Sequence, residues 1–123
     1  MKKILVVEDD PVNLQILTDY LGANGYAMRA AVNGVEGIAA FHSEQPDLML
    51  IDVQLPRKSG FEVCQEVKAD SELQATKILM LTAKGRDTEV AKGLAMGADG
   101  YMTKPFSTKD LAARVRQMLD GAA

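Results

Sequence analysis

In the segment Ile4-Leu5-Val6-Val7-Glu8-Asp9-Asp10-Pro11, an apolar run stops abruptly at three acids and a proline, and this pattern indicates the fold class. Two further runs have the same character, Leu48-Met49-Leu50-Ile51 and Ile78-Leu79-Met80-Leu81. Non-alternating apolar runs of about four to eight residues are typical of strands buried on both faces. Such strands occur in parallel sheets whose crossover helices cover both sides. A weaker run from Tyr26 to Val32 and a short one at Tyr101-Met102 complete five predicted strands.

The segments between these runs are predicted to be helices. Asp10 suits the N-cap of the first helix, and Pro11 suits its first turn. The helix from Arg86 to Met96 is predicted to be weak, because it has few large apolar residues and several glycines. The other helices are expected to bury apolar stripes, which are Val12, Ile16, Leu17, Tyr20 and Leu21; Val35, Ile38 and Ala39; Phe61, Cys64 and Val67; and, after a Ser107 cap, Leu111, Val115, Met118 and Leu119.

Five strands that alternate with five helices predict an α/β fold. The expected architecture is a flavodoxin-like, doubly wound (βα)5 three-layer sandwich with right-handed crossovers. Its parallel sheet is expected to have the strand order 2-1-3-4-5. With 123 residues, the chain is expected to form one domain over residues 1–123.

Composition excludes several classes of function. One Cys and one His rule out a disulfide framework and any metal site built from several of these residues. A net charge of −3 does not favour direct binding to nucleic acid. No apolar run approaches the roughly 18 residues that a membrane span needs, and the N-terminal apolar run is too short for a secretory signal. We therefore expect a cytoplasmic protein that does not contact the membrane.

Chemistry-bearing side chains follow the predicted strands at their carboxyl ends, where ligands collect in doubly wound sheets. They are Glu8 and Asp9, Asp52, Thr82, and Lys104. Clustered carboxylates need a counter-charge, which a lysine and a cation with oxygen ligands such as Mg²⁺ would supply. Carboxylates, Mg²⁺, a lysine and a hydroxyl suit phosphoryl transfer to a carboxylate. The chain has neither GxxxxGK[ST] nor GxGxxG, so a nucleotide donor held by a phosphate-binding loop is not expected.

The same residues carry a family resemblance. The pattern comprises Val6-Val7-Glu8-Asp9-Asp10-Pro11, Leu50-Ile51-Asp52-Val53-Gln54-Leu55-Pro56 with Gly60, Leu81-Thr82-Ala83, and Gly97-Ala98-Asp99-Gly100-Tyr101-Met102-Thr103-Lys104-Pro105-Phe106. It resembles the receiver domain of two-component response regulators, the CheY-like family, from Lys3 to Leu119. The resemblance implies a signalling switch that accepts a phosphoryl group in the presence of Mg²⁺. It does not imply an enzyme beyond self-phosphorylation from a donor and autodephosphorylation.

The resemblance also implies roles for the clustered residues. Asp52 would be the phosphoacceptor and Lys104 would pair with the phosphoryl oxygens. Asp9, Asp52 and the backbone carbonyl of Gln54 would bind Mg²⁺, and Glu8 would act through a metal-bound water. Asp10 is better explained as a helix N-cap than as a ligand.

Further roles concern signalling. Thr82 would hydrogen-bond the phosphoryl group and Tyr101 would turn inward behind it, which would reshape the face of the fourth helix, fifth strand and fifth helix. Gln54 and Lys84 would tune the rate at which the acyl phosphate is hydrolysed. With a lysine at position 84, we expect slow to moderate self-dephosphorylation. The Lys104–Pro105 peptide would be cis.

The implied partners are a histidine kinase or a histidine phosphotransfer protein, together with a downstream protein target or an output domain in another chain. A dimer that forms on phosphorylation is a further prediction, because Asp99, Arg114 and Arg116 resemble charges in the dimers of some DNA-binding relatives, although Gly100 lacks their second acid.

Three alternatives stay open at this point. One is a receiver-like binding module that works without phosphorylation. Another is a phosphatase of the haloacid dehalogenase type, although such enzymes carry an acid where this chain has Gln54. A flavin carrier shares the fold, but the chain has no Trp and no Ser/Thr-rich phosphate loop.

Overall fold

The computed structural model describes residues 2–55, 57–69, 76–83, 87–104 and 106–120. Within them, each strand is followed by a helix. The elements are β1 (Lys3–Val7), α1 (Pro11–Ala23), β2 (Ala27–Ala31), α2 (Gly34–Glu44), β3 (Leu48–Asp52), α3 (Gly60–Ala69), β4 (Lys77–Ala83), α4 (Asp87–Ala95), β5 (Gly100–Lys104) and α5 (Thr108–Leu119).

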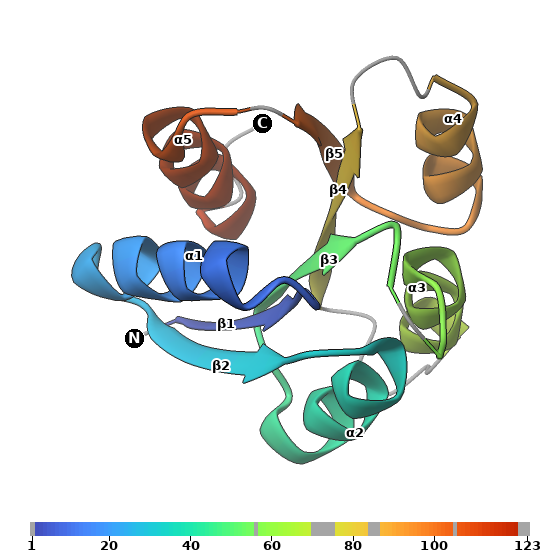
Figure 1. The fold of residues 1–123 in the computed structure, drawn as a ribbon, viewed down its shortest axis with the longest axis horizontal. Coiled ribbons are helices and arrows are strands. Elements are labelled where there is room, and N and C mark those ends of the chain that lie inside the picture. The colour runs from blue at the N-terminus through green and yellow to red at the C-terminus, as the bar shows by residue number, and fades with distance from the viewer. Residues whose placement is uncertain (1, 56, 70–75, 84–86, 105, 121–123) are drawn as a thin grey trace.

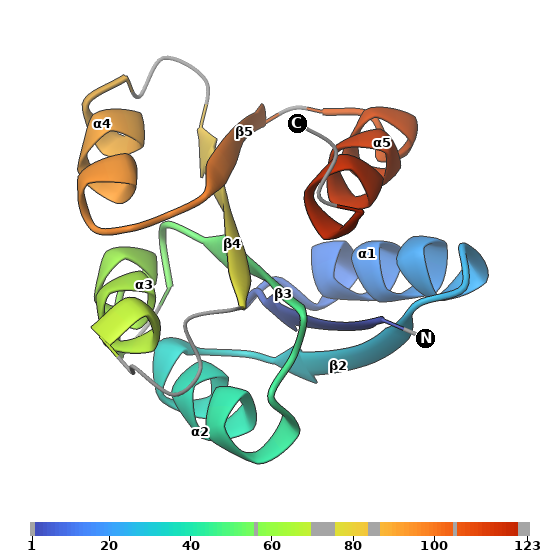
Figure 2. The same ribbon diagram turned by 180° about the vertical axis from the view of Figure 1, so that it is seen from behind.

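The strands form one sheet in the order β2-β1-β3-β4-β5, and every neighbouring pair is parallel. Helices α1 and α5 cover one face, and α2, α3 and α4 cover the other, as the two opposite views show (Figure 1, Figure 2). The predicted α/β sandwich and its strand order are therefore confirmed. Because all strands run in the same direction, their carboxyl ends meet at one edge of the sheet.

The core has two halves, one on each side of the sheet. Ile4 and Val6 of β1 pack on the α1 and α5 side, whereas Leu5 and Val7 pack on the other side. All four are fully buried. This arrangement explains the non-alternating runs, because successive strand residues point to opposite faces and both faces are covered. Each fully buried aliphatic side chain contributes roughly 1.5–3 kcal/mol to the stability of the fold. The strands that carry the site residues are therefore held firmly in the core.

The predicted stripes of the first two helices are wrong in part. Val12 and Ile16 of α1 are 64% and 48% exposed, and the helix buries Leu17 and Leu21. These two exposed residues belong to the first half of α1, which begins at the carboxyl edge of the sheet, where the chain leaves β1. A helical period identifies an apolar stripe but not the part of it that a neighbouring element covers.

In α2, Val35 and Ala39 are exposed, while Gly34, Gly37 and Phe41 are buried. A Cβ added to Gly37 would lie 3.0 Å from Cγ1 of Val7. Glycine therefore lets this helix approach β1 closely, and that contact sets which face of α2 turns inward.

Other local predictions are confirmed. Asp10 caps α1, because its Oδ1 accepts a hydrogen bond from the backbone N–H of Val12 at 3.1 Å. Ser107 caps α5 in the same way, by accepting from the N–H of Asp110. No helix among the described residues is long and apolar enough to cross a membrane.

Candidate functional site

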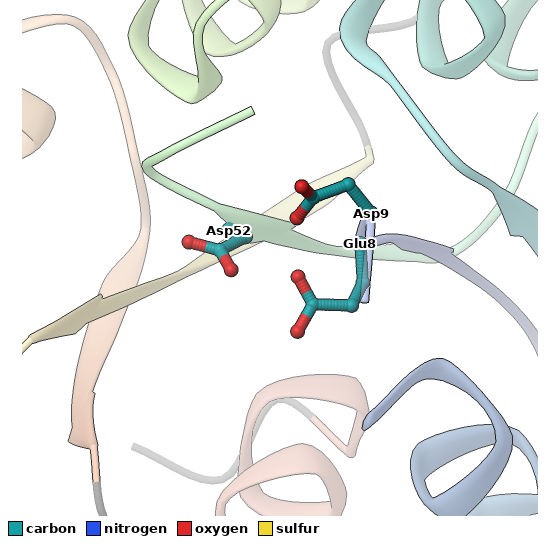
Figure 3. Close-up of side chains that lie close together, drawn as sticks. All are labelled: Glu8, Asp9 and Asp52. Atoms are coloured by element: carbon teal, nitrogen blue, oxygen red, sulfur yellow. The ribbon is translucent and has the colours of Figure 1, made fainter. Parts of the chain in front are cut away.

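The carboxyl edge of the sheet brings the predicted site residues together. Glu8 and Asp9 directly follow β1, Asp52 ends β3 and Lys104 ends β5. One carboxylate oxygen from each of Glu8, Asp9 and Asp52 lies within 4.8 Å of the others. Figure 3 shows the three side chains close together at the ends of β1 and β3, with Glu8 lowest, on the side of the helices below. The three acids thus surround one point from two neighbouring strands.

Asp52 is held from two directions. Its Oδ2 accepts a hydrogen bond from the Lys104 ammonium at 2.7 Å, and its Oδ1 accepts one from the backbone N–H of Gln54 at 3.0 Å. The Lys104 nitrogen also lies 3.8 Å from Oε1 of Glu8. Asp52 is 7% exposed, so its carboxylate is buried but reaches a cavity of about 290 Å³ that Glu8, Asp9, Gln54 and Lys104 also line.

The backbone around Asp52 is closely packed. A Cβ on Gly60 would lie 2.3 Å from the Asp52 carbonyl oxygen, and the N–H of Gly60 donates to the Val53 carbonyl at 3.0 Å. Glycine is therefore required at this position by space. The start of α3 at Gly60 is therefore packed against the chain that leaves the end of β3.

Charge crowding alters the titration of the site. Burial raises the pKa of Glu8 to about 7, and Asp52 acts in the same direction, whereas Lys104 and Asn13 oppose the shift. Burial alone would lower the pKa of Lys104, but the hydrogen bond and charge of Asp52, with smaller contributions from Glu8 and Asp9, raise it. Lys104 is consequently a permanent cation, while Glu8 gains or loses its proton near neutral pH.

A divalent cation with a preference for oxygen fits this arrangement. The neighbouring donors are all oxygens, and Oε2 of Glu8 is a buried atom with no hydrogen-bond partner among the described residues. Mg²⁺ characteristically binds one or two carboxylates and keeps several waters. A metal-bound water would give the unpartnered Glu8 oxygen a donor. The residues present therefore fit the predicted Mg²⁺.

The predicted switch residues, Thr82 and Tyr101, lie next to α4. Thr82 is 2% exposed, Tyr101 is 42% exposed, and both line a cleft between the strands and α4 that also contains Val90 and Leu94. Thr82 and Thr103 are paired across β4 and β5, which places Thr82 one residue short of the level of Lys104. Lys84 and Pro105, and so the predicted tuning lysine and cis peptide, lie outside the described residues.

One residue of the site was missed from the sequence. Asn13 lines both the acidic cavity and a second cavity of about 320 Å³, which lies between α1 and the chain around Phe106 and Thr108. Asn13 also lowers the pKa of Glu8. Its position in the first turn of α1, immediately after the acids and Pro11, is a signal that could have identified it, because that turn must face the end of β1.

Of the charges considered for a dimer, Asp99 has partners within its own chain. Oδ2 of Asp99 accepts a hydrogen bond from the N–H of Ile78 at 2.8 Å and pairs with the Lys68 ammonium at 2.8 Å. Nη2 of Arg114 lies 2.7 Å from the place that a Cβ of Gly100 would occupy. Asp99 therefore supports β4 of its own chain, and the dimer stays a prediction.

Comparison with known proteins assigns this site to a class. The family model of the response regulator receiver domain matches residues 4–116. The chain therefore belongs to the response regulator receiver domains, which are phosphoacceptor signalling switches of two-component systems. Receiver domains bind Mg²⁺ in an acidic pocket, and response regulators interact with histidine kinases and output domains. This family membership favours the receiver interpretation over a phosphatase or a flavin carrier.

Individual relatives agree with the family. The chain is 40% identical over 119 residues to the DNA-binding dual master transcriptional regulator RpaA of Synechocystis sp., covering 97% of this chain and 49% of the relative. It is 41% identical over 118 residues to the probable transcriptional regulator ycf27 of Guillardia theta, covering 96% and 45%. The chain thus spans about half the length of the curated relatives it matches.

Among solved structures, the fold is similar to that of the chemotaxis response regulator CheY4 of Vibrio cholerae, with a TM-score of 0.91 and 32% identity over 97% of this chain and 99% of that chain. A putative response regulator from Chloroflexus aurantiacus gives a TM-score of 0.92 at 33% identity, over 97% and 98% of the two chains.

Proposed function

We propose that Asp52 accepts a phosphoryl group from the phosphohistidine of a histidine kinase or a histidine phosphotransfer protein. The observation that carries this proposal is the position of the Asp52 carboxylate, 2.7 Å from the Lys104 ammonium and next to two further acids with oxygen atoms within 4.8 Å. Asp9, Asp52, the Gln54 carbonyl and, through water, Glu8 are proposed to hold Mg²⁺. The proposed setting is the cytoplasm.

The transfer is proposed as an in-line displacement. A carboxylate oxygen of Asp52 forms a bond to phosphorus, the phosphorus–nitrogen bond to the donor imidazole breaks, and the imidazole keeps the electron pair and takes up a proton. Mg²⁺, when bound, would neutralise charge on the phosphoryl oxygens. Lys104 is placed to pair with a phosphoryl oxygen, because its ammonium already lies beside the accepting carboxylate. Attack of water on the acyl phosphate would restore Asp52 and release inorganic phosphate.

The signal is proposed to leave the site through Thr82 and Tyr101. A phosphoryl group on Asp52 adds charge and hydrogen-bond acceptors, and the Thr82 hydroxyl is a donor in a buried position on the adjacent strand. Movement of Thr82 would open room in the cleft that it shares with Tyr101, so that the exposed ring turns inward. The face of α4, β5 and α5 would then change for a downstream target or an output domain.

The output itself is proposed by analogy. A relative covered to 49% of its length is described as a DNA-binding transcriptional regulator. An output domain, in the same protein or in another chain, would read the switched face. The described domain itself is not proposed to bind nucleic acid.

Intact mass spectrometry tests the proposal. The protein is incubated with acetyl phosphate and Mg²⁺, and wild type is expected to gain one phosphoryl group. Asp52→Asn and a chelator should each abolish the gain. Asp19→Asn, which removes an exposed carboxylate on the far part of α1, is the matched control and should leave it intact. No gain in wild type would instead favour the module that works without phosphorylation.

A further inference from the structure

Among the glycines that the structure describes, the one with the least room for a side chain is Gly34, at the start of α2 and outside the acidic cluster. A Cβ built on Gly34 would lie 2.1 Å from the carbonyl oxygen of Lys58 and 2.6 Å from its Cβ. The oxygen is a backbone atom and the position of Cβ is fixed by the backbone, so the contact cannot be relieved by turning a flexible side chain. Gly34 does not have the positive φ that favours glycine, so space and not backbone conformation excludes a larger residue.

Lys58 belongs to the loop that starts at the phosphoacceptor strand. The loop carries Gln54, whose N–H bonds to Oδ1 of Asp52 and whose carbonyl is proposed to bind Mg²⁺. Ordinary contact with a Cβ begins at 3.4 Å, so an alanine at position 34 requires about 1.3 Å of displacement between α2 and Lys58.

Helix α2 is not free to supply this displacement. Its N-cap Asn33 is 8% exposed and bonds to the N–H of Glu36 at 2.9 Å, and Phe41 is fully buried in the core. Gly37, one turn after Gly34, already lies against the side chain of Val7. The helix is therefore fixed at its first turn and along its inner face.

The end of the loop that joins α3 is also closely packed. Gly60 is pressed against the Asp52 carbonyl, and its N–H bonds to the carbonyl of Val53. Arg57, directly before Lys58, has a φ of 69°, a conformation that non-glycine residues seldom adopt. With α2 and the Gly60 end of the loop both closely packed, the Gln54 end is the part of the loop that an added Cβ at position 34 would displace.

The geometry points to Gly34 as a positioning residue for the metal-binding loop: its missing side chain lets the first turn of α2 brace Lys58 and so hold the Gln54 carbonyl in place for Mg²⁺. This inference rests on the proposed function, because it assumes that Mg²⁺ binds at Asp9, Asp52 and Gln54. Partners that orient metal ligands typically change metal affinity by about 10- to 100-fold when they are altered. Gly34→Ala is therefore expected to weaken Mg²⁺ binding roughly tenfold.

The test compares Gly34→Ala with Gly37→Ala, the same change one turn further along α2, where the added Cβ meets a side chain of β1 and not the loop. Mg²⁺ affinity is measured by NMR titration of backbone amides, and stability by urea unfolding in EDTA. The rate of phosphorylation is then measured at varied Mg²⁺ concentration and, separately, at varied acetyl phosphate concentration. Gly34→Ala should raise the Mg²⁺ concentration that gives a half-maximal rate. The acetyl phosphate concentration that gives a half-maximal rate should stay unchanged.

Equal Mg²⁺ affinities of Gly34→Ala and Gly37→Ala would overturn the inference, whatever their stabilities. If Gly34→Ala does not fold, the wild-type titration decides: the amides of Lys58 and Gly34 should shift with Mg²⁺ more than that of Gly22, which has only ordinary contacts. Shifts no larger than that of Gly22 would also overturn it. Absence of any Mg²⁺ response in wild type would refute the proposed function itself, which is a separate result.

Discussion

Replacement of Glu8 by glutamine should stabilise the metal-free domain, although it removes a residue proposed to serve Mg²⁺. Glu8 is 1% exposed, and burial together with Asp52 raises its pKa from the ordinary 4.5 to about 7. Glutamine has nearly the same shape and carries no charge. The variant therefore removes the cost of a buried ionised carboxylate.

The magnitude follows from the pKa. Between pH 4.5 and 7 the folded domain keeps a proton on Glu8 that the unfolded chain has lost, so the free energy of unfolding falls as the pH rises through this window. At about 1.36 kcal/mol per pH unit, the full loss above pH 7 is about 3 kcal/mol. Glu8→Gln should therefore match wild type near pH 4.5 and exceed it by about 3 kcal/mol at pH 8, or roughly 10 °C in Tm.

Urea unfolding in EDTA at pH 5 and at pH 8 measures this difference. Asp19→Asn makes the same change of charge at an exposed position and should alter the free energy of unfolding by less than about 0.5 kcal/mol at both pH values. Saturating Mg²⁺ should stabilise wild type more than Glu8→Gln, because binding to the folded state adds to its stability. A stability difference of equal size at pH 5 and pH 8 would refute the reasoning.

Three further predictions concern single side chains. Lys104→Met should tighten Mg²⁺ binding at least about fivefold in an NMR titration, because a cation beside the site is lost. The same variant should be phosphorylated more slowly by acetyl phosphate. Weaker Mg²⁺ binding would contradict this prediction. Burial raises the pKa of the Cys64 thiol to about 11, so iodoacetamide at pH 8 should alkylate the native protein on the order of a hundredfold more slowly than the urea-unfolded chain; similar rates would show an accessible thiolate. Asp99→Ala should lower the free energy of unfolding by about 1–3 kcal/mol in urea, because it leaves the Ile78 N–H without its acceptor, and Asp99→Asn should recover part of the loss; an unchanged stability would mean that the acceptor is not needed.

The sheet could be predicted because its strands carry their structure in the sequence. Ile4 to Val7, Leu48 to Ile51 and Ile78 to Leu81 are apolar without alternation, and only a strand covered on both faces buries all of them. The helix cap at Asp10 was predictable for a similar reason, since it depends on residues two positions apart.

The inward faces of the helices could not be predicted in the same way. Val12 and Ile16 have helical spacing and are apolar, yet both are largely exposed. Which part of a stripe is covered depends on where neighbouring elements end. Close packing at Gly37 and Phe41 sets the orientation of α2. Of the predicted stripe, Ile38 packs against the core, whereas Val35 and Ala39 are exposed.

By itself, the sequence determined the strands, their alternation with helices, and the set of acids and lysine at the strand ends, because these depend on local patterns and on the rules that connect parallel strands. How those groups act together depends on the packing of distant segments. The crowding that raises the pKa of Glu8 arises from separate strands brought to one edge. The contact between Gly34 and Lys58 has no local signature, since it joins segments 24 positions apart through backbone atoms that every residue possesses.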